Sequence, residues 1–172
     1  MNIYAALNDN QCTYPLVINI AMLALKIPPV VLVFICCLLM WIVQAVTPEL
    51  LFQPPQPILL FLAFSTLGFA FALAGVLSFK RAQTTVNPMT PDSSSSLVVS
   101  GIYSVTRNPM YIGFLCFLIG FAFFLSHYLA FIWCAGFIWY MNKYQIAPEE
   151  HALTKIFGEE YKEYCLKTRR WL

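Results

Sequence analysis

The fold of this chain is decided by residues 109–144, PMYIGFLCFLIGFAFFLSHYLAFIWCAGFIWYMNKY. Two apolar runs, 109–125 and 128–144, are separated only by Ser126 and His127. Each run is close to the length of about 17–25 residues that a helix needs to cross the hydrocarbon core of a bilayer. Because so short a link forces the chain to turn back on itself, the stretch predicts an antiparallel pair of transmembrane helices.

Two further apolar runs lie towards the N-terminus, at 58–79 and 28–46. The run 28–46 begins with two prolines, which suit the first turn of a helix because an N–H there would be unpaired anyway. A stripe of small residues on one face of 58–79 permits close helix packing. The stripe consists of Gly68, Ala72 and Gly75. The predicted fold class is therefore all-α, an integral membrane bundle of about four transmembrane helices.

The composition indicates lipid rather than water as the surroundings of the chain. Of the 172 residues, 60% are hydrophobic and only 10% are charged, whereas about a quarter are charged in an average soluble domain. The net charge of +2 is too small to indicate nucleic acid. His127 and His151 have no second ligand at helical spacing and there is no C-x-x-C motif, so no metal is expected. The expected partner is membrane lipid.

The last segment, 145–172, differs from the predicted spans. Its apolar residues follow helical spacing with charges between them, and Pro148-Glu149-Glu150 has the character of a first helical turn. These features predict a C-terminal amphipathic helical tail at the membrane interface rather than a fifth span. Residues 1–27 are read as an N-terminal extension, for which an interfacial helix is one interpretation, and 28–172 as one membrane domain.

Basic residues flank the long polar loop 82–108 and recur in the tail, while the loop 47–57 and the turn 126–127 have none. Lys and Arg accumulate in the cytoplasmic loops of membrane proteins. The loop 82–108 and the C-terminal tail are therefore expected to face the cytosol.

A candidate site follows from this topology, because the hairpin places the start of run 109–125 beside the end of run 128–144. The side chains expected there are Arg107, Asn108, Pro109, Tyr111, Tyr140, Asn142, Lys143, Tyr144, Glu149 and Glu150. Arginine, carboxylates and aromatic rings together suit a ligand that carries both charges and a flat ring. Taken singly, each residue is explained equally well as a membrane anchor, an aromatic belt residue or part of a helix start.

Two blocks of the sequence resemble the isoprenylcysteine carboxyl methyltransferase family. The family signature G-x-Y-x-x-x-R-H-P-x-Y-x-G is similar to Gly101-Ile102-Tyr103 followed by Arg107-Asn108-Pro109-Met110-Tyr111-Ile112-Gly113. The family's tail pattern E-E-x-x-L-x-x-x-F-G-x-x-Y-x-x-Y resembles Glu149-Glu150, Leu153, Phe157-Gly158, Tyr161 and Tyr164. The ending Arg169-Arg170-Trp171-Leu172 also looks similar, and the resemblance covers roughly residue 22 to the end.

The resemblance implies transfer of a methyl group from S-adenosylmethionine to a lipophilic acceptor, a prenylcysteine-like carboxylate or another small lipid. It implies a cofactor site at the cytosolic end of the last two spans, closed by the tail, in a bacterial inner membrane. The implied cofactor-binding residues are Tyr103, Arg107, Asn108, Pro109, Tyr111, Glu149 and Glu150, of which Arg107 and Glu150 are also expected to be catalytic.

The implied roles differ among these residues. Arg107 would orient a carboxylate of the cofactor or the acceptor, and Glu149 or Glu150 would bind the ribose hydroxyls or the amino group. The adenosyl pocket would be lined by Tyr103, Asn108 and Tyr111. Two positions depart from the family: Asn108 replaces the usual histidine and cannot become charged, and Gln145 stands where many members carry arginine.

A phosphatidylethanolamine N-methyltransferase, with an amine acceptor, is a related alternative. Two functions of other classes are also compatible with the same residues. Membrane sterol reductases that use NADPH have a similar R-x-P-x-Y block, but their chains are usually longer and have more spans. A non-enzymatic membrane scaffold that binds a partner on its polar face is the third interpretation, and it predicts no cofactor binding.

Overall fold

The computed structural model describes residues 27–81 and 97–172, and throughout these residues the regular secondary structure is helical. The helices are α1 (Pro29–Val46), α2 (Pro57–Arg81), α3 (Pro109–Leu125), α4 (Ala130–Tyr140), α5 (Ala147–Phe157) and α6 (Glu159–Lys167). Shorter elements are the 3-10 turns η1 (Pro48–Leu50) and η3 (Gly101–Ser104) and the π-helix η4 (Met141–Ile146). The all-helical prediction is confirmed for this part of the chain. The predicted N-terminal extension 1–27 falls almost entirely outside the described residues.

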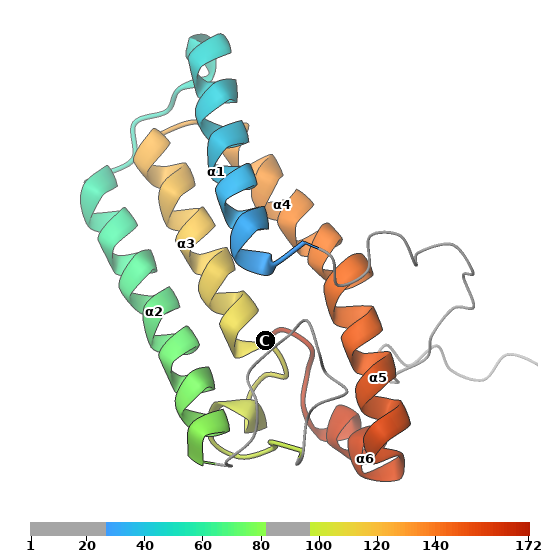
Figure 1. Ribbon diagram of the computed structural model, residues 1–172. Helices are drawn as coiled ribbons and strands as arrows, with labels where there is room; N and C mark the ends of the chain where they lie inside the picture. The colour runs from blue at the N-terminus through green and yellow to red at the C-terminus, as the bar shows by residue number, and fades with distance from the viewer. Residues whose placement is uncertain (1–26, 82–96) are drawn as a thin grey trace, which may run out of the picture.

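Helix α3 is the centre of the bundle and packs against α1, α2 and α4 (Figure 1). Ser126 ends α3 in the left-handed conformation, with φ 54°, and the chain then returns along α3 as α4. The predicted helical hairpin is therefore present. Helix α4 continues without a break through η4 into α5, which leads away from α3 towards α6.

Three of these helices begin at a proline; the sequence predicts this for α1 and α3, whereas it places Pro57 at the end of the loop before the run 58–79. The first residues of α1, α2 and α3 are Pro29, Pro57 and Pro109, respectively. Proline costs no hydrogen bond there, because the first N–H groups of a helix have no partner within the helix. The sequence therefore fixes these helix starts to within about one residue.

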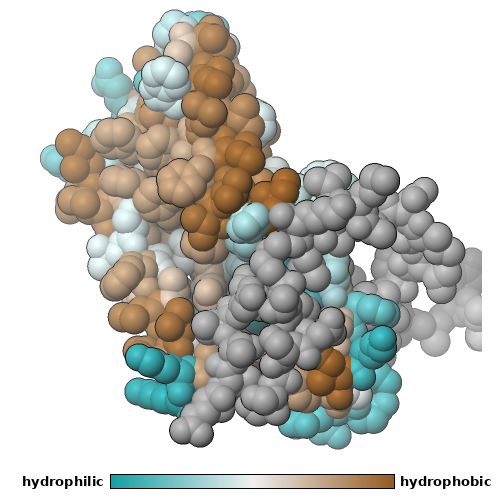
Figure 2. Space-filling model, viewed as in Figure 1, coloured by the Kyte–Doolittle hydropathy of each residue, from teal (hydrophilic) through white to brown (hydrophobic). Residues whose placement is uncertain are grey.

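Helices α1 and α2 are long and apolar enough to cross a membrane, judged by length and composition. Only 28% of the apolar window of α1 and 11% of that of α2 are buried, and large apolar side chains such as Phe34 and Phe69 point outward. A core helix of a water-soluble protein would bury most of such residues. Figure 2 shows apolar surface over the upper part of the bundle and hydrophilic residues at its lower end. These features indicate a membrane protein.

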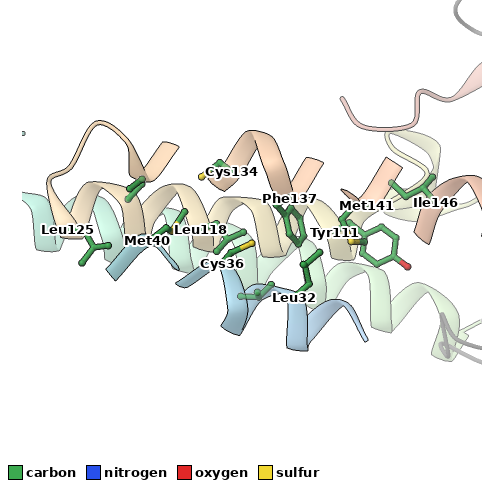
Figure 3. Packing of buried hydrophobic residues seen from close by; sticks show 13 residues of the cluster. Leu32, Cys36, Met40, Tyr111, Leu118, Leu125, Cys134, Phe137, Met141 and Ile146 are labelled. Carbon is green, nitrogen blue, oxygen red and sulfur yellow. The ribbon is translucent and has the colours of Figure 1, made fainter. Parts of the chain in front are cut away.

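The interior of the bundle is built by side chains of α1, α3 and α4 (Figure 3). Met40, Leu118 and Phe137, one from each helix, are completely buried. Cys36 and Cys134 lie in the same cluster as free thiols. This packing holds α4 against α3, and so determines the positions of η4 and α5, which continue from α4.

The α2–α3 contact depends on glycine. A Cβ atom added at Gly68 would lie 2.5 Å from the backbone oxygen of Gly113, and one added at Gly113 would lie 2.6 Å from the backbone oxygen of Gly68. A Cβ at Gly113 would also meet the side chain of Ala72 at 3.3 Å. The predicted stripe of small residues is thus confirmed as the surface on which the two backbones meet.

We expect Gly68→Ala to destabilise the bundle, because backbone atoms of α3 cannot yield to the added methyl group unless the helices separate. Overpacking of this kind costs about 1–3 kcal/mol, so the midpoint of thermal unfolding in detergent should fall. The matched control is Gly136→Ala on α4, where nothing lies within 4 Å of an added Cβ. An unchanged midpoint for Gly68→Ala, or an equal fall for both variants, would contradict this account of the interface.

The end of the bundle opposite η4 is tied by the loop that follows α1. The backbone N–H of Phe52 donates to the oxygen of Ser126 at 2.9 Å, and that of Tyr128 donates to the oxygen of Leu50 at 3.2 Å. His127 is fully buried there, with Nε2 2.8 Å from the oxygen of Thr47. The loop between α1 and α2 is therefore joined to the α3–α4 turn at this end, while the arginines and glutamates of the candidate site lie at the other end.

Candidate active site

The first half of the site is the segment that leads into α3. Asn108 is the residue before the helix and Pro109 its first residue, which leaves Arg107 just outside the helix and Tyr111 in its first turn. Pro109 is buried. The second half is η4 and the first turn of α5, which contains Glu149 and Glu150.

Tyr111 joins the two halves through its hydroxyl group. This hydroxyl donates to Oε2 of Glu149 at 2.9 Å and accepts a hydrogen bond from Nε2 of Gln145 at 3.4 Å. Gln145 and Tyr111 are both buried. Gln145, where the family pattern has arginine, is thus a neutral donor that orients the Tyr111 hydroxyl towards Glu149.

Glu150 joins the same two halves through ion pairs. Its side chain is only 3% exposed, and Oε1 lies 3.1 Å from Nη2 of Arg107. Arg170, near the end of the chain, binds both oxygens: Nε donates to Oε1 at 3.1 Å and Nη2 to Oε2 at 2.5 Å. A buried carboxylate requires such partners, because an unpaired charge is costly in a medium of low polarity.

Arg107 is also held by the last segment of the chain. Its backbone N–H donates to the oxygen of Arg169 at 2.9 Å, and Nη1 donates to the oxygen of Cys165 at 3.4 Å. The side chain is 10% exposed. The guanidinium therefore lies between α5, through Glu150, and the end of α6.

Asn108 does not use its side chain to cap α3. Nδ2 donates instead to the backbone oxygen of Arg170 at 2.9 Å. The backbone N–H of Asn108 donates to Oγ1 of Thr106 at 3.2 Å. An amide supplies this donor without carrying a charge, so asparagine serves to hold the end of the chain here.

Tyr103 lies beside the same cluster, in η3. It is buried, its ring meets that of Phe79 edge-on at 5.2 Å, and its backbone oxygen accepts a hydrogen bond from the Tyr164 hydroxyl at 2.7 Å. Burial is the main cause that raises the pKa of the Tyr103 phenol, and the nearby Glu149 carboxylate raises this pKa further. Tyr103 therefore stays protonated and able to donate a hydrogen bond.

Glu149 differs from Glu150 in its surroundings. It is partly buried, and its Oε2 accepts the hydrogen bond from Tyr111. Burial raises the pKa of this carboxyl to about 7; the Tyr111 hydrogen bond opposes the shift and the neighbouring Glu150 charge adds to it. Glu149 therefore keeps its proton to a higher pH than an ordinary carboxyl does.

The π-helix η4 is a feature that sequence reasoning did not predict. At its end the N–H of Ala147 donates to the oxygen of Asn142, five residues earlier. Pro148 follows and cannot donate, which is the signal that could have indicated an irregular turn. Such π-turns occur frequently at functional sites. Here the turn leads directly into Glu149 and Glu150.

Sequence reasoning also assigned the side chains of residues 168–172 no role in the site. The structure brings Arg170 onto Glu150 and Trp171 onto Asn142, whose Oδ1 accepts the indole N–H at 3.0 Å. The red segment that ends at C in Figure 1 lies between the start of α3 and α5. The adjacent basic residues and the tryptophan at the end of the tail were the signal in the sequence that could have indicated this part in the site.

The apolar helices and the ionisable cluster at one end define a membrane protein with a polar site at the end of a helical bundle. Within that class, the chain belongs to the phospholipid methyltransferase family, whose family model matches residues 58–160. This match covers α2 from its second residue, all of η3, α3, α4, η4 and α5, and the first two residues of α6, and so includes both halves of the site.

Several curated proteins are similar to the chain. Protein-S-isoprenylcysteine O-methyltransferase B of Arabidopsis thaliana is 29% identical over 99 residues, 58% of this chain and 50% of that protein. Protein-S-isoprenylcysteine O-methyltransferase of Schizosaccharomyces pombe is 31% identical over 71 residues, 41% of this chain and 30% of that protein. An uncharacterized protein of Haemophilus influenzae is 41% identical over 63 residues, 37% of this chain and its own whole length.

These similarities confirm the predicted resemblance to isoprenylcysteine methyltransferases. The matched region spans half the length of the Arabidopsis protein and less of the yeast protein. No solved structure matches the chain.

Proposed function

We propose that this protein transfers a methyl group from S-adenosylmethionine to a lipophilic acceptor at the cytosolic face of a membrane. The observation that carries the proposal is the joining of the two sequence blocks at one end of the bundle. Arg107 pairs with Glu150, and Tyr111 with Glu149, in a chain of the phospholipid methyltransferase family. The acceptor is a prenylcysteine-like carboxylate or another small lipid.

The side chains present fit S-adenosylmethionine by their chemistry. The partly buried Glu149 carboxylate suits an amino group or ribose hydroxyls, and the Arg107 guanidinium suits a carboxylate. Aromatic rings suit a cationic group, and Tyr103 and Tyr111 lie beside Glu149. Asn108 and Pro109 complete the proposed set of cofactor-binding residues, because they form the start of α3 beside this cluster. Glu150 contributes by holding the Arg107 guanidinium in place through their ion pair.

The bound cofactor would supply a methyl group that is already activated by its sulfonium. The protein's own residues then have to align the two reactants and keep water away from them. Arg107 and Glu150, the proposed catalytic residues, contribute charge and orientation. A carboxylate acceptor needs no general base, so the absence of a titratable group at Asn108 does not prevent the reaction.

The proposed topology has four spans, at about residues 28–46, 58–79, 109–125 and 128–144, in a single membrane domain 28–172 that follows an extension 1–27. Lys80 and Arg81 in the last turn of α2 support a cytosolic position for the site. They lie next to Phe79, whose ring contacts Tyr103 of the site. The tail 145–172 would lie at the interface of a bacterial inner membrane.

The direct test uses purified protein in lipid nanodiscs. We expect calorimetry to detect binding of S-adenosylmethionine, and we expect label from the methyl group to enter a lipid-soluble product. The acceptors to supply are a farnesylcysteine analogue, phosphatidylethanolamine and a total membrane lipid extract. Binding of NADPH without S-adenosylmethionine would favour a reductase instead, and binding of neither would favour a scaffold.

The raised pKa of Glu149 gives the site a defined pH dependence. Only the ionised carboxylate accepts hydrogen bonds from an amino group or hydroxyls, so we expect affinity for S-adenosylmethionine to rise between about pH 6 and about pH 8. Stability should fall over a lower window, from about pH 4.5 to about pH 7, and should level off above it. The folded carboxyl keeps its proton up to about pH 7, against 4.5 for an ordinary carboxyl, so the folded chain binds more protons than the unfolded chain.

Calorimetry and thermal unfolding at several pH values check the two trends. Glu149→Gln is the matched variant, since it keeps the size of the side chain but cannot ionise. It should bind weakly, with little dependence on pH. A wild-type affinity that stays constant between about pH 6 and about pH 8 would show that Glu149 does not contact the cofactor as a carboxylate.

A further inference from the structure

The segment 168–172, called here the C-terminal strap, is paired with the segment that leads into α3. Thr106 and Arg169 form an isolated parallel bridge. The backbone oxygen of Arg170 accepts hydrogen bonds from Nδ2 of Asn108 at 2.9 Å and from Oγ1 of Thr106 at 3.3 Å. Thr106 and Thr168 are both buried. The strap is therefore held to the segment before α3 through its backbone.

The side chains of the strap reach the other half of the site. Arg170 binds Glu150 of α5, and Trp171 donates to Asn142 of η4. The strap thus contacts the start of α3 through its backbone and η4–α5 through its side chains. Arg107 and Glu150, the two proposed catalytic residues, are each bound to it.

We propose that Arg170 is a positioning residue of the site, which sets the orientation of Glu150 and through it that of Arg107. This inference rests on the proposed function, because it assigns Arg170 a part in binding the cofactor. Arg170 holds the two carboxylate oxygens at once, Oε1 through Nε and Oε2 through Nη2, while Nη2 of Arg107 lies 3.1 Å from Oε1. Two parallel hydrogen bonds fix the plane of a carboxylate, which a single contact does not do.

The same contacts give Asn108 its function. The Asn108 amide holds the backbone of Arg170, Arg170 holds Glu150, and Glu150 holds Arg107, the residue next to Asn108. The four residues form a closed ring, in which the peptide bond between Arg107 and Asn108 is the last link. Asn108 therefore acts on the site through the strap, in a way that requires a donor and no change of charge.

The exposed fractions of these side chains show which member of the ring lies outermost. The Arg170 side chain is 36% exposed, against 10% for Arg107 and 3% for Glu150. Arg170 can therefore be replaced without opening a large cavity, and its loss should alter the orientation of the other two charges more than the packing of the bundle.

The test compares Arg170→Ala and Arg170→Lys with Arg169→Ala in nanodiscs. Arg169 is the matched control, because its side chain is exposed and its backbone oxygen, which pairs with Arg107, is retained in alanine. We expect Arg170→Ala to raise the dissociation constant for S-adenosylmethionine by about tenfold or more, the effect of losing charged hydrogen bonds. Arg170→Lys should restore little of it, because lysine cannot make the two-point contact.

Two further readouts separate positioning from folding. Hydrogen exchange at residues 106–108 should increase in Arg170→Ala and stay unchanged in Arg169→Ala, while the thermal midpoint changes little in either. Wild-type affinity in Arg170→Ala, or an equal loss in Arg169→Ala, would overturn the inference while leaving the proposed function standing. Failure of the wild-type protein to bind S-adenosylmethionine would overturn the proposed function itself, and the role of Arg170 with it.

Discussion

Glu150→Ala is expected to abolish methyl transfer and to destabilise the protein more than any other single change at the site. Removing this carboxylate leaves the guanidinium groups of Arg107 and Arg170 without the negative charge that they share. Breaking a buried ion pair by removing one partner costs about 3–5 kcal/mol. The segment before α3, the strap and α5 all lose a common point of attachment.

Two measurements on one preparation check this result: the thermal midpoint in detergent and the rate of methyl transfer. The midpoint should fall clearly, and the rate should fall by at least about a hundredfold, as expected when reacting groups are displaced by about 1 Å. Glu160→Ala is the control, since Glu160 is an exposed carboxylate on α6. A Glu150→Ala protein as stable and active as the Glu160→Ala protein would show that the ion pairs are dispensable.

The difference between Glu149 and Glu150 illustrates what the sequence alone did not determine. Adjacent glutamates at a helix start are equivalent in a sequence pattern, so either one was an equally good candidate to bind the cofactor. In the folded chain their side chains point to different partners, Glu150 to two arginines and Glu149 to Tyr111. Those partners come from segments some distance along the chain, which helical periodicity does not describe.

Other features were predictable because their causes are local. Helix starts at Pro29 and Pro109 follow from the missing N–H group of proline. The α2–α3 contact follows from the small residues of one helix face, which are visible in the sequence at helical spacing. The hairpin follows from the shortness of the link between two apolar runs.

The fourth predicted span shows where local reasoning reaches its limit. The sequence predicts one helix over 128–144, but the α-helical part is α4, Ala130–Tyr140, and the residues that follow form the π-helix η4, Met141–Ile146. Apolarity decides that this segment is helical. The position of Pro148 and the contacts of Asn142 and Gln145 decide how its last turn is wound. Those contacts depend on α3 and the strap, and so they are known only once the chain is folded.

Arg107→Ala is expected to have a different outcome from Glu150→Ala, although the two residues form one ion pair. When Arg107 is removed, Glu150 keeps its two-point contact with Arg170 and so remains paired. Its charge stays compensated, and the thermal midpoint should fall by much less than in Glu150→Ala. Methyl transfer should nevertheless be lost to a similar degree, at least about a hundredfold, because Arg107 is the group proposed to orient a carboxylate of the reactants.

This contrast separates the catalytic role of Arg107 from its role in the fold. Arg107→Lys refines it, since lysine keeps the charge but not the planar fork of donors that also reaches Cys165. We expect Arg107→Lys to match the wild type in thermal midpoint and to remain far less active, with weakened binding of S-adenosylmethionine in calorimetry. Suppose instead that Arg107→Ala lost as much stability as Glu150→Ala, and that its loss of activity were fully explained by the loss of folded protein. Arg107 would then be a structural partner of Glu150 and would have no catalytic role.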